Sequence, residues 1–213
     1  MHWSAATNLR LSFQTHPLIK HRESLPPNAR RLIEKFAPVY DVSEYHETVV
    51  HEPIQAVYDA LRTADFGDSR LIRTLLRLRQ LPAALGKPRQ PRMILNLDAI
   101  LKSGFVLLGD NAPDEIALGV IGQFWKLSGG RYCVDAAGFD AFDQPGYARA
   151  VWNFSLVDLG ANVTRLATET RVVCSDGAGR IRFRLYWTLI GPFSGLIRRQ
   201  ILREIKRKAE SRF

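Results

Sequence analysis

The chain has 213 residues, a formal net charge of +9, 46% hydrophobic residues and 24% charged residues. This length suits one good hydrophobic core or two small ones, and the composition is typical of ordinary globular proteins. No apolar run approaches the roughly 18 to 20 residues needed to cross a bilayer, and the N-terminus lacks a secretory signal pattern. We therefore expect a cytoplasmic protein.

The positive charge leaves three kinds of surface open. It could favour nucleic acid, it could favour an anionic membrane, or it could be a solvated surface without a partner. The charges are spread over several predicted helices and are not interleaved with aromatic residues in a loop. This distribution favours the solvated surface and makes nucleic acid an unlikely partner.

The first 40 residues differ from the rest of the chain. They hold four prolines and show no sustained periodicity, although one short helix is expected from Asn28. Such a segment either wraps a domain or stays partly irregular. We expect an N-terminal extension over 1–40 and one domain over 41–213.

The domain is expected to begin with one strand and two helices. Glu44–His51 reads as a strand, and Ile54–Leu61 as a helix with proline in its first turn. A second helix is predicted over Ser69–Gln80, with leucines on one face and arginines on another. Asn96 should cap a further short helix that runs to Lys102.

The hydrophobic period changes to two after residue 104. The predicted strands are Phe105–Asp110, Glu115–Trp125, Tyr147–Asp158 and Val163–Ser175. The links between them are too short for crossover helices, so the sheet should be antiparallel, with helices on one face in an α+β arrangement. A helical period then returns from Phe183 to Ile205, and Gly191-Pro192 should kink this final helix into two segments.

This order of elements, together with several local strings, resembles the START-like, Bet v 1-like helix-grip superfamily (SRPBCC), which includes polyketide cyclases. The strings are Tyr45–Leu61, Gly104–Asp110, Leu118–Trp125, Pro145–Phe154, Thr164–Cys174 and the run from Arg182–Trp187 through Arg198-Arg199. The resemblance covers about residues 41–210 and is closest to a bacterial branch. It brings no catalytic motif, because that superfamily shares a fold and a cavity rather than one active site.

The resemblance implies a curved antiparallel sheet of about seven strands around a long C-terminal helix. Two short helices after the first strand would complete the mouth of a cavity for lipids, polyketides or similar apolar molecules. Small-molecule sites are generally concave and mostly apolar, with few polar groups.

Strand alternation gives the residues expected to line that cavity. The more apolar face of each strand is assigned to the concave side, towards the final helix. The expected ligand-binding residues are Leu118, Val120, Phe124, Trp152, Phe154, Thr168, Thr170, Phe183 and Trp187. The alternative is that Trp152 and Phe154 pack directly on the final helix and leave no void, since protein interiors are close-packed by default.

Glu169 and Arg171 are the most notable charged pair. They lie two apart in a strand, so they share a face. On the convex face they would be an ordinary surface pair of little energetic value. If the facing were reversed, they could orient a ligand carboxylate or take part in acid–base chemistry.

The sequence predicts neither a metal site nor a cofactor. His46 and His51 are five apart in a predicted strand and so point to opposite faces, which excludes a shared metal ion. Cys133 and Cys174 have no His or Cys at ligand spacing, and each is expected to be a small buried residue. Nucleotide-binding glycine motifs and hydrolase nucleophile motifs are absent from the sequence.

Three hypotheses of function follow. We favour a non-catalytic binder or carrier of an apolar small molecule, driven by burial of ligand surface. The alternative is an enzyme of cyclase or dehydratase type, which needs an ionisable pocket residue such as His46, Glu169 or Arg171. The third is a basic adaptor for nucleic acid or for an anionic membrane, the membrane being bound through Arg70, Arg73 and Arg77 of the predicted helix. The ligand and the oligomeric state are left open by the sequence.

Overall fold

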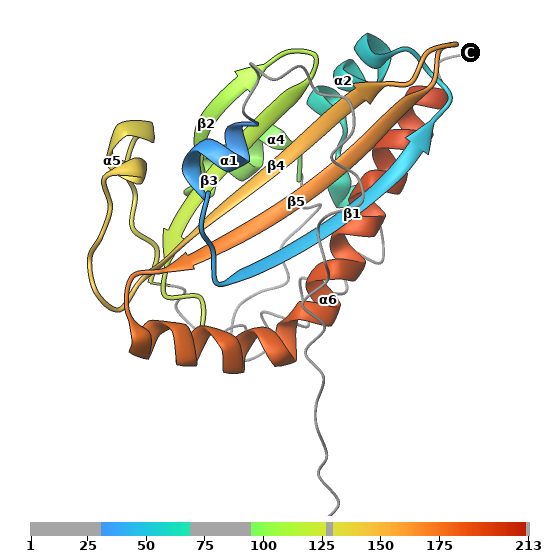
Figure 1. Ribbon diagram of the computed structural model, residues 1–213. Coiled ribbons are helices and arrows are strands. Elements are labelled where there is room, and N and C mark those ends of the chain that lie inside the picture. Colours follow the sequence, from blue (N-terminus) through green and yellow to red (C-terminus); the bar gives the residue numbers. More distant parts are fainter. Residues whose placement is uncertain (1–30, 69–94, 127–129, 212–213) are drawn as a thin grey trace, which may run out of the picture. The chain divides into compact units, whose positions relative to one another are not determined.

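The structure is a computed structural model, and it describes residues 31–68, 95–126 and 130–211. Within these residues the chain is an α+β protein with a curved antiparallel sheet and a long C-terminal helix (Figure 1). The family resemblance implied about seven strands, whereas the described residues form five. That expectation is corrected here, because no further described segment pairs with the sheet as a strand.

The element bounds follow the predicted ones closely. The strands are β1 (Val42–Val50), β2 (Val106–Asn111), β3 (Glu115–Gly122), β4 (Ala148–Asp158) and β5 (Thr164–Cys174). The helices are α1 (Leu32–Phe36), α2 (Ile54–Thr63), α4 (Leu97–Lys102), α5 (Ala136–Asp140) and α6 (Gly177–Glu210), with a 3-10 turn η1 (Phe66–Asp68). Asn96 caps α4 as expected, because its side chain accepts a hydrogen bond from the amide of Ala99 at 2.8 Å.

The strand order is β1-β5-β4-β3-β2, and neighbouring strands are antiparallel. The first strand therefore lies beside the last one, at one edge of the described sheet. In this register Glu44 stands opposite Thr170, and His46 stands opposite Thr168. Residues more than a hundred positions apart in the chain are thus placed side by side on one face.

The final helix α6 is continuous rather than divided into two segments. It begins earlier than expected, because Asp176 caps it by accepting from the amide of Gly179. Pro192 lies inside the helix, near its middle, and Figure 1 shows α6 bending about midway along its length. Proline removes one helical hydrogen bond and crowds the preceding turn, which accounts for a bend without a break.

Helices cover both faces of the sheet, whereas one covered face was expected. On one face, α2, α4 and the second half of α6 pack on Phe154, Leu156 and Leu166. The first half of α6 packs on the same face through its own residue Phe183. On the other face, α1 and α5 close a separate cluster that includes Ile33, Phe36, Ala117, Phe139 and Val151.

A buried carboxylate attaches α1 to the sheet. Glu115 of β3 accepts hydrogen bonds from the backbone amides of Leu32, at 2.7 Å, and Ile33, at 3.4 Å. It also accepts from the side-chain amide of Asn153 at 2.6 Å. Unpaired amides at a helix N-terminus favour a negative charge, so this contact holds α1 against the sheet.

Some predictions fall outside the described residues. They include the helix over Ser69–Gln80 with its arginine stripe, and the extension up to residue 30. The residues that the structure describes all belong to one compact unit. The domain boundary near residue 40 stays a prediction.

Candidate functional site

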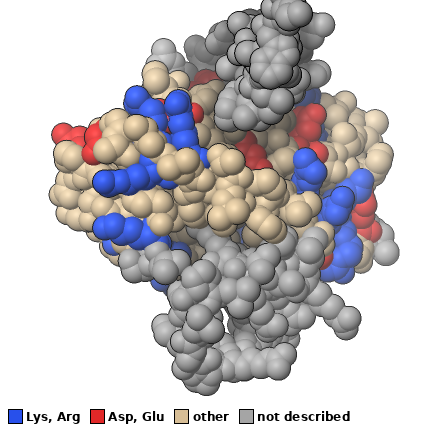
Figure 2. All heavy atoms as spheres, turned by 90° about the horizontal axis from the view of Figure 1, so that it is seen from below, with Lys and Arg blue, Asp and Glu red and all other residues tan. Residues whose placement is uncertain are grey.

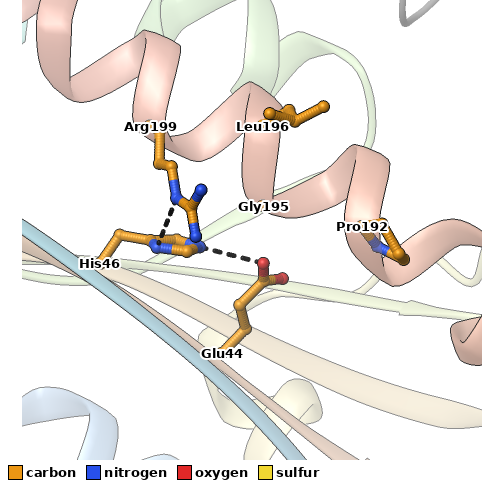
Figure 3. Close-up of a pocket in the computed structure, with 6 residues that line it drawn as sticks. All are labelled: Glu44, His46, Pro192, Gly195, Leu196 and Arg199. Carbon is orange, nitrogen blue, oxygen red and sulfur yellow. Dashed lines mark hydrogen bonds and ion pairs between the residues drawn. The ribbon is translucent and has the colours of Figure 1, made fainter.

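A pocket of about 350 Å³ opens between β1 and α6 (Figure 3). Its lining comes from two elements that are distant in the chain. The lining residues are Glu44, His46, Pro192, Gly195, Leu196 and Arg199. The pocket thus combines two apolar side chains with three ionisable ones.

His46 lies between a carboxylate and a guanidinium. Its Nε2 is 3.0 Å from Oε1 of Glu44, and its Nδ1 is 3.4 Å from Nε of Arg199 (Figure 3). Arginine can only donate, so Nδ1 of His46 accepts and Nε2 donates to the carboxylate. The neutral imidazole with its proton on Nε2 satisfies both contacts. His46 and Glu44 are alternate residues of β1, which is why both point towards α6.

Arg198 contacts Glu44 without being one of the residues that line the pocket. Its Nη2 and Nε donate to Oγ1 of Thr170 at 2.6 and 3.0 Å, and its Nη1 lies 3.4 Å from Oε2 of Glu44. The side chains of Arg198 and Glu44 are only 13% and 14% exposed. Protein atoms therefore cover most of this charge pair, although Glu44 also borders the pocket, and the contact restricts the position of the carboxylate.

The polar contacts continue from the pocket into the interior of the sheet. The guanidinium of Arg198 lies 5.8 Å from the ring centroid of Trp152, within cation–π range. The indole Nε1 of Trp152 donates to Oγ1 of Thr168 at 2.7 Å. Thr168 in turn donates to the backbone carbonyl of Asn153 at 2.8 Å. The buried hydroxyl and indole groups on this face are thus satisfied within the protein.

Gly195 allows β1 and α6 to approach closely at the pocket. A Cβ atom added there would lie 2.5 Å from Oε1 of Glu44 and 3.2 Å from Nε2 of His46. Any side chain would therefore displace the carboxylate or the imidazole. The absence of a side chain at this position is part of how the site is built.

Of the nine residues predicted to bind a ligand, six lie on the face of the sheet that α6 covers, Phe124 follows β3, and Phe183 and Trp187 belong to α6 itself. Leu118 and Phe154 belong to one apolar cluster, with Trp152 packed against it. Val120 and Phe183 belong to another, where the Phe183 ring stacks on Trp187 at 5.6 Å and meets Phe124 edge-on at 6.1 Å. Thr168 and Thr170 take part in the polar contacts already described. None of the nine is among the residues lining this pocket, and their role in binding stays a prediction.

Glu169 and Arg171 lie on the opposite face, as the alternation predicted, but they are not an ordinary surface pair. Nε of Arg171 is 2.7 Å from Oε1 of Glu169, and the two side chains are 12% and 9% exposed. Arg171 also donates to the carbonyl of Ala37 at 3.1 Å, and its guanidinium lies 4.7 Å from the ring centroid of Tyr40. The segment after α1 therefore closes over the pair, and the pair serves packing rather than the pocket.

Sequence reasoning named His46 as an ionisable candidate but missed Glu44, Arg198 and Arg199. One signal was available, because Glu44 and His46 occupy the same alternating face of β1 as the buried Val50. Two polar residues on an inward face indicate a site or a buried pair. The basic residues towards the C-terminal end of the predicted helix were open to two interpretations, an interfacial membrane helix or an ordinary solvated surface, and neither indicated a pocket.

Other candidate chemistries find no support in the described part of the chain. Three or more His, Cys, Asp or Glu side chains do not gather there in a way that could hold a metal ion. Cys133 is exposed, contrary to expectation, and Cys174 is buried. Burial, followed by the charge of Asp41, raises the pKa of the Cys174 thiol to about 12, so this thiol stays protonated at neutral pH.

The described helices also include none with the length and apolar character needed to cross a membrane. The location of the protein in the cell stays a prediction.

Comparisons with known proteins leave the family open. No protein-family model matches the sequence, and no curated protein matches it. A conserved protein from Geobacillus kaustophilus is similar in structure, at 10% identity and a TM-score of 0.40 over 79% of this chain and 95% of that one.

Two further solved structures show the same level of similarity. A hypothetical protein from Helicobacter pylori has 12% identity and a TM-score of 0.36 over 89% of this chain and 99% of that one. An aromatase/cyclase from Streptomyces has 12% identity and a TM-score of 0.30, covering 80% and 96% of the two chains. With all three scores below 0.5, these similarities carry no argument about the pocket, and the resemblance to helix-grip proteins stays a prediction.

Proposed function

We propose that this protein binds a small amphipathic molecule in the pocket between β1 and α6. The observation that carries the proposal is the pocket of about 350 Å³, in which Glu44 and His46 are held in fixed positions beside the apolar Pro192 and Leu196. Binding sites for small molecules are concave and combine apolar walls with a few oriented polar groups, in volumes of about 300 to 1,000 Å³.

The polar end of the ligand is expected to be a hydrogen-bond acceptor. The carboxylate of Glu44 already accepts from His46 and lies beside Arg198. Arg199 uses its Nε–H towards His46, and a guanidinium has further N–H groups to offer. A carboxylate, a carbonyl or an enolate oxygen therefore suits the site, while the hydrocarbon part of the ligand would contact Pro192 and Leu196.

The nine residues predicted from the sequence enter this proposal as the packed layer between the sheet and α6. Trp152 is the member of this layer that contacts Arg198, whose guanidinium lies 5.8 Å from its ring centroid. A lipid-like or polyketide-like ligand with a longer apolar part would extend past Trp152. A short ligand would fill the outer pocket alone.

Gly195→Ala tests the site directly, because the new methyl group must displace Glu44 or His46. We expect binding of the amphipathic fluorescent anion 1-anilinonaphthalene-8-sulfonate, and of a long-chain fatty acid that competes with it, to weaken about ten-fold. Gly177→Ala is the matched control, since it makes the same change in the same helix and its Cβ would meet no atom within 4 Å. Fluorescence titration measures both dissociation constants.

Native mass spectrometry of the purified protein, followed by solvent extraction, would identify a ligand that it carries. The binding proposal is wrong if neither probe binds the wild type, or if both glycine variants bind as the wild type does. Circular dichroism confirms that each variant retains its fold, so that weaker binding can be assigned to the pocket.

A second candidate function is acid–base catalysis of the cyclase or dehydratase type on a bound polyketide-like molecule. It is favoured by the 3.0 Å contact between Glu44 and His46 at the pocket wall, since a carboxylate that orients an imidazole is a common arrangement for proton transfer. His46 would exchange the proton at Nδ1 once the ligand takes over the contact with Arg199, and Glu44 would position the ring through Nε2.

The variants His46→Gln and Glu44→Gln distinguish a binding protein from a catalyst. For a catalyst, both variants should retain binding of the probe anion within a few-fold while conversion of a poly-β-ketone test substrate falls by about 10² or more. Chromatography of the reaction mixture measures that conversion. If the wild type leaves the test substrate unchanged, the binding function stands and catalysis on that substrate class is excluded.

A further inference from the structure

The outward face of the first half of α6 is apolar. Ile181, Leu185 and Leu189 are 64%, 71% and 68% exposed, and Leu196 further along is 44% exposed. Residues four and seven apart lie on the same side of a helix, so these four side chains form one row, which we name the α6 stripe. Pro192 is also exposed and falls within the same row.

The α6 stripe stands out from the rest of the described surface. Single exposed apolar residues are normal, but a contiguous row along one helix marks a surface that meets something other than water. Four of the ten large hydrophobic side chains that are exposed in the described residues belong to this one row. The inward side of the same helix carries Phe183, which is 2% exposed, so α6 is apolar on both sides here.

The charges that α6 itself carries around the stripe have one sign, while Asp41 and Glu44 pair with Arg180 and Arg198 from outside the helix. Residues 177–203 contain six arginines and no acidic residue. At 100° per residue, Arg182 falls on one side of the stripe and Arg184 on the other, and both are exposed. Figure 2, which views the molecule from below, the side on which the first half of α6 lies, shows uncharged surface between groups of Lys and Arg.

We propose that the α6 stripe docks on an anionic membrane surface. A helix that lies in the membrane interface places its leucines among the upper acyl chains and extends its arginines to the lipid phosphates. A row of apolar side chains with arginine on both sides has this chemistry. A nucleic acid would leave the leucines in water, and two copies packed stripe to stripe would bring like charges together.

The end of the α6 stripe coincides with the pocket. Pro192 and Leu196 lie in the row and also line the pocket. Docking would therefore hold the pocket mouth at the level of the lipid headgroups. The inference does not depend on the proposed function, because Ile181, Leu185 and Leu189 are not among the lining residues.

Sedimentation of the full-length protein with vesicles tests this docking. We expect binding to vesicles of phosphatidylcholine with phosphatidylserine, and little binding to phosphatidylcholine alone. Leu185→Gln/Leu189→Gln should weaken binding about ten-fold or more, since it removes two inserting side chains. Arg182→Gln/Arg184→Gln should weaken it by about 30-fold, from about 1 kcal/mol for each arginine at an anionic surface.

The matched control is Val39→Gln/Leu159→Gln, which removes two exposed apolar residues outside α6, 80% and 46% exposed. It should bind the anionic vesicles as the wild type does. Docking through α6 is overturned if the wild type does not bind anionic vesicles, if it binds neutral vesicles equally well, or if the leucine and control variants bind alike. It is also overturned if sedimentation equilibrium shows a dimer that Leu185→Gln/Leu189→Gln dissociates, because a second copy then covers the stripe.

Discussion

The two faces of the sheet each carry a Glu–Arg pair, and the difference between the pairs is in what covers them. On the α1 face, Arg171 contacts Glu169, and the carbonyl of Ala37 and the ring of Tyr40 complete its surroundings. On the α6 face, Arg198 lies beside Glu44, but Glu44 lines a pocket together with His46. One pair is closed by the protein itself, and the other borders the pocket.

In this comparison, two similar Glu–Arg pairs differ in their surroundings, because protein atoms cover one pair and the pocket borders the other. A closed pair has lost its water and relies on its partners alone, so removing one partner leaves a charge buried. A pair at a pocket retains access to water or ligand and can be rearranged at lower cost. Low exposure alone therefore does not separate a structural charge from a functional one.

The largest expected effect is on the closed pair. Arg171→Met should lower the free energy of unfolding by about 3 kcal/mol, because the carboxylate of Glu169 stays buried without its partner. Urea denaturation measures the change. Glu169→Gln/Arg171→Met should recover much of the loss, and no recovery would show that the arginine acts through packing rather than charge.

The second-largest effect is expected from Glu115, the carboxylate that holds α1 against the sheet. Glu115→Ala should lower the free energy of unfolding by about 2 kcal/mol, because two backbone amides of α1 and the amide of Asn153 lose their acceptor. Hydrogen exchange followed by mass spectrometry should show faster exchange over residues 32–36. Unchanged exchange there would mean that Glu115 does not hold α1.

A smaller effect is expected from the pair at the pocket. Arg198→Met should lower the free energy of unfolding by about 1 kcal/mol, since it removes hydrogen bonds to Thr170 while water can reach Glu44 from the pocket. Urea denaturation of this variant and of Arg171→Met compares the two losses in the free energy of unfolding. Equal losses in the two variants would contradict the distinction between a closed and an open pair.

The smallest effect is expected from Asp176, a half-buried carboxylate that caps α6 as Glu115 caps α1. Hydrogen bonds from the amides of Gly179 and Gly146 hold the pKa of this carboxyl below its ordinary value of 3.8. A lowered folded pKa gives stability that is present above the ordinary pKa and is lost as pH falls through the folded one. Asp176→Ala should therefore lower Tm by a few degrees at neutral pH, and the difference from the wild type should disappear in acid.

Local patterns in the sequence predicted most of the elements. The alternation in β4 and β5 assigned Trp152 and Thr168 to the α6 side, and Asn96 and Pro53 marked helix starts at the right places. The start of α6 was placed too late, because two glycines after Asp176 read as a loop. A cap can start a helix despite such residues when the following turns are buried.

The candidate site was harder to predict, because it depends on strand register and on distant contacts. Nothing local to Glu44 shows that it will stand opposite Thr170, or that Arg198 will reach both. The cover over Arg171 likewise comes from residues more than 130 positions away in the chain. Alternation gives the face on which a side chain lies, but not what lies above it.

The bend in α6 has a consequence for the size of the pocket. Pro192 has no amide hydrogen, so the carbonyl of Thr188 lacks its usual helical donor at the point where the pocket lining begins. The two halves of α6 are anchored separately, through Phe183 on one side and Ile201 and Ile205 on the other. We expect that a small change in the bend angle of α6 at Pro192 would widen or narrow the pocket entrance while both halves of the helix stay packed. The same helix could then accommodate ligands of different width.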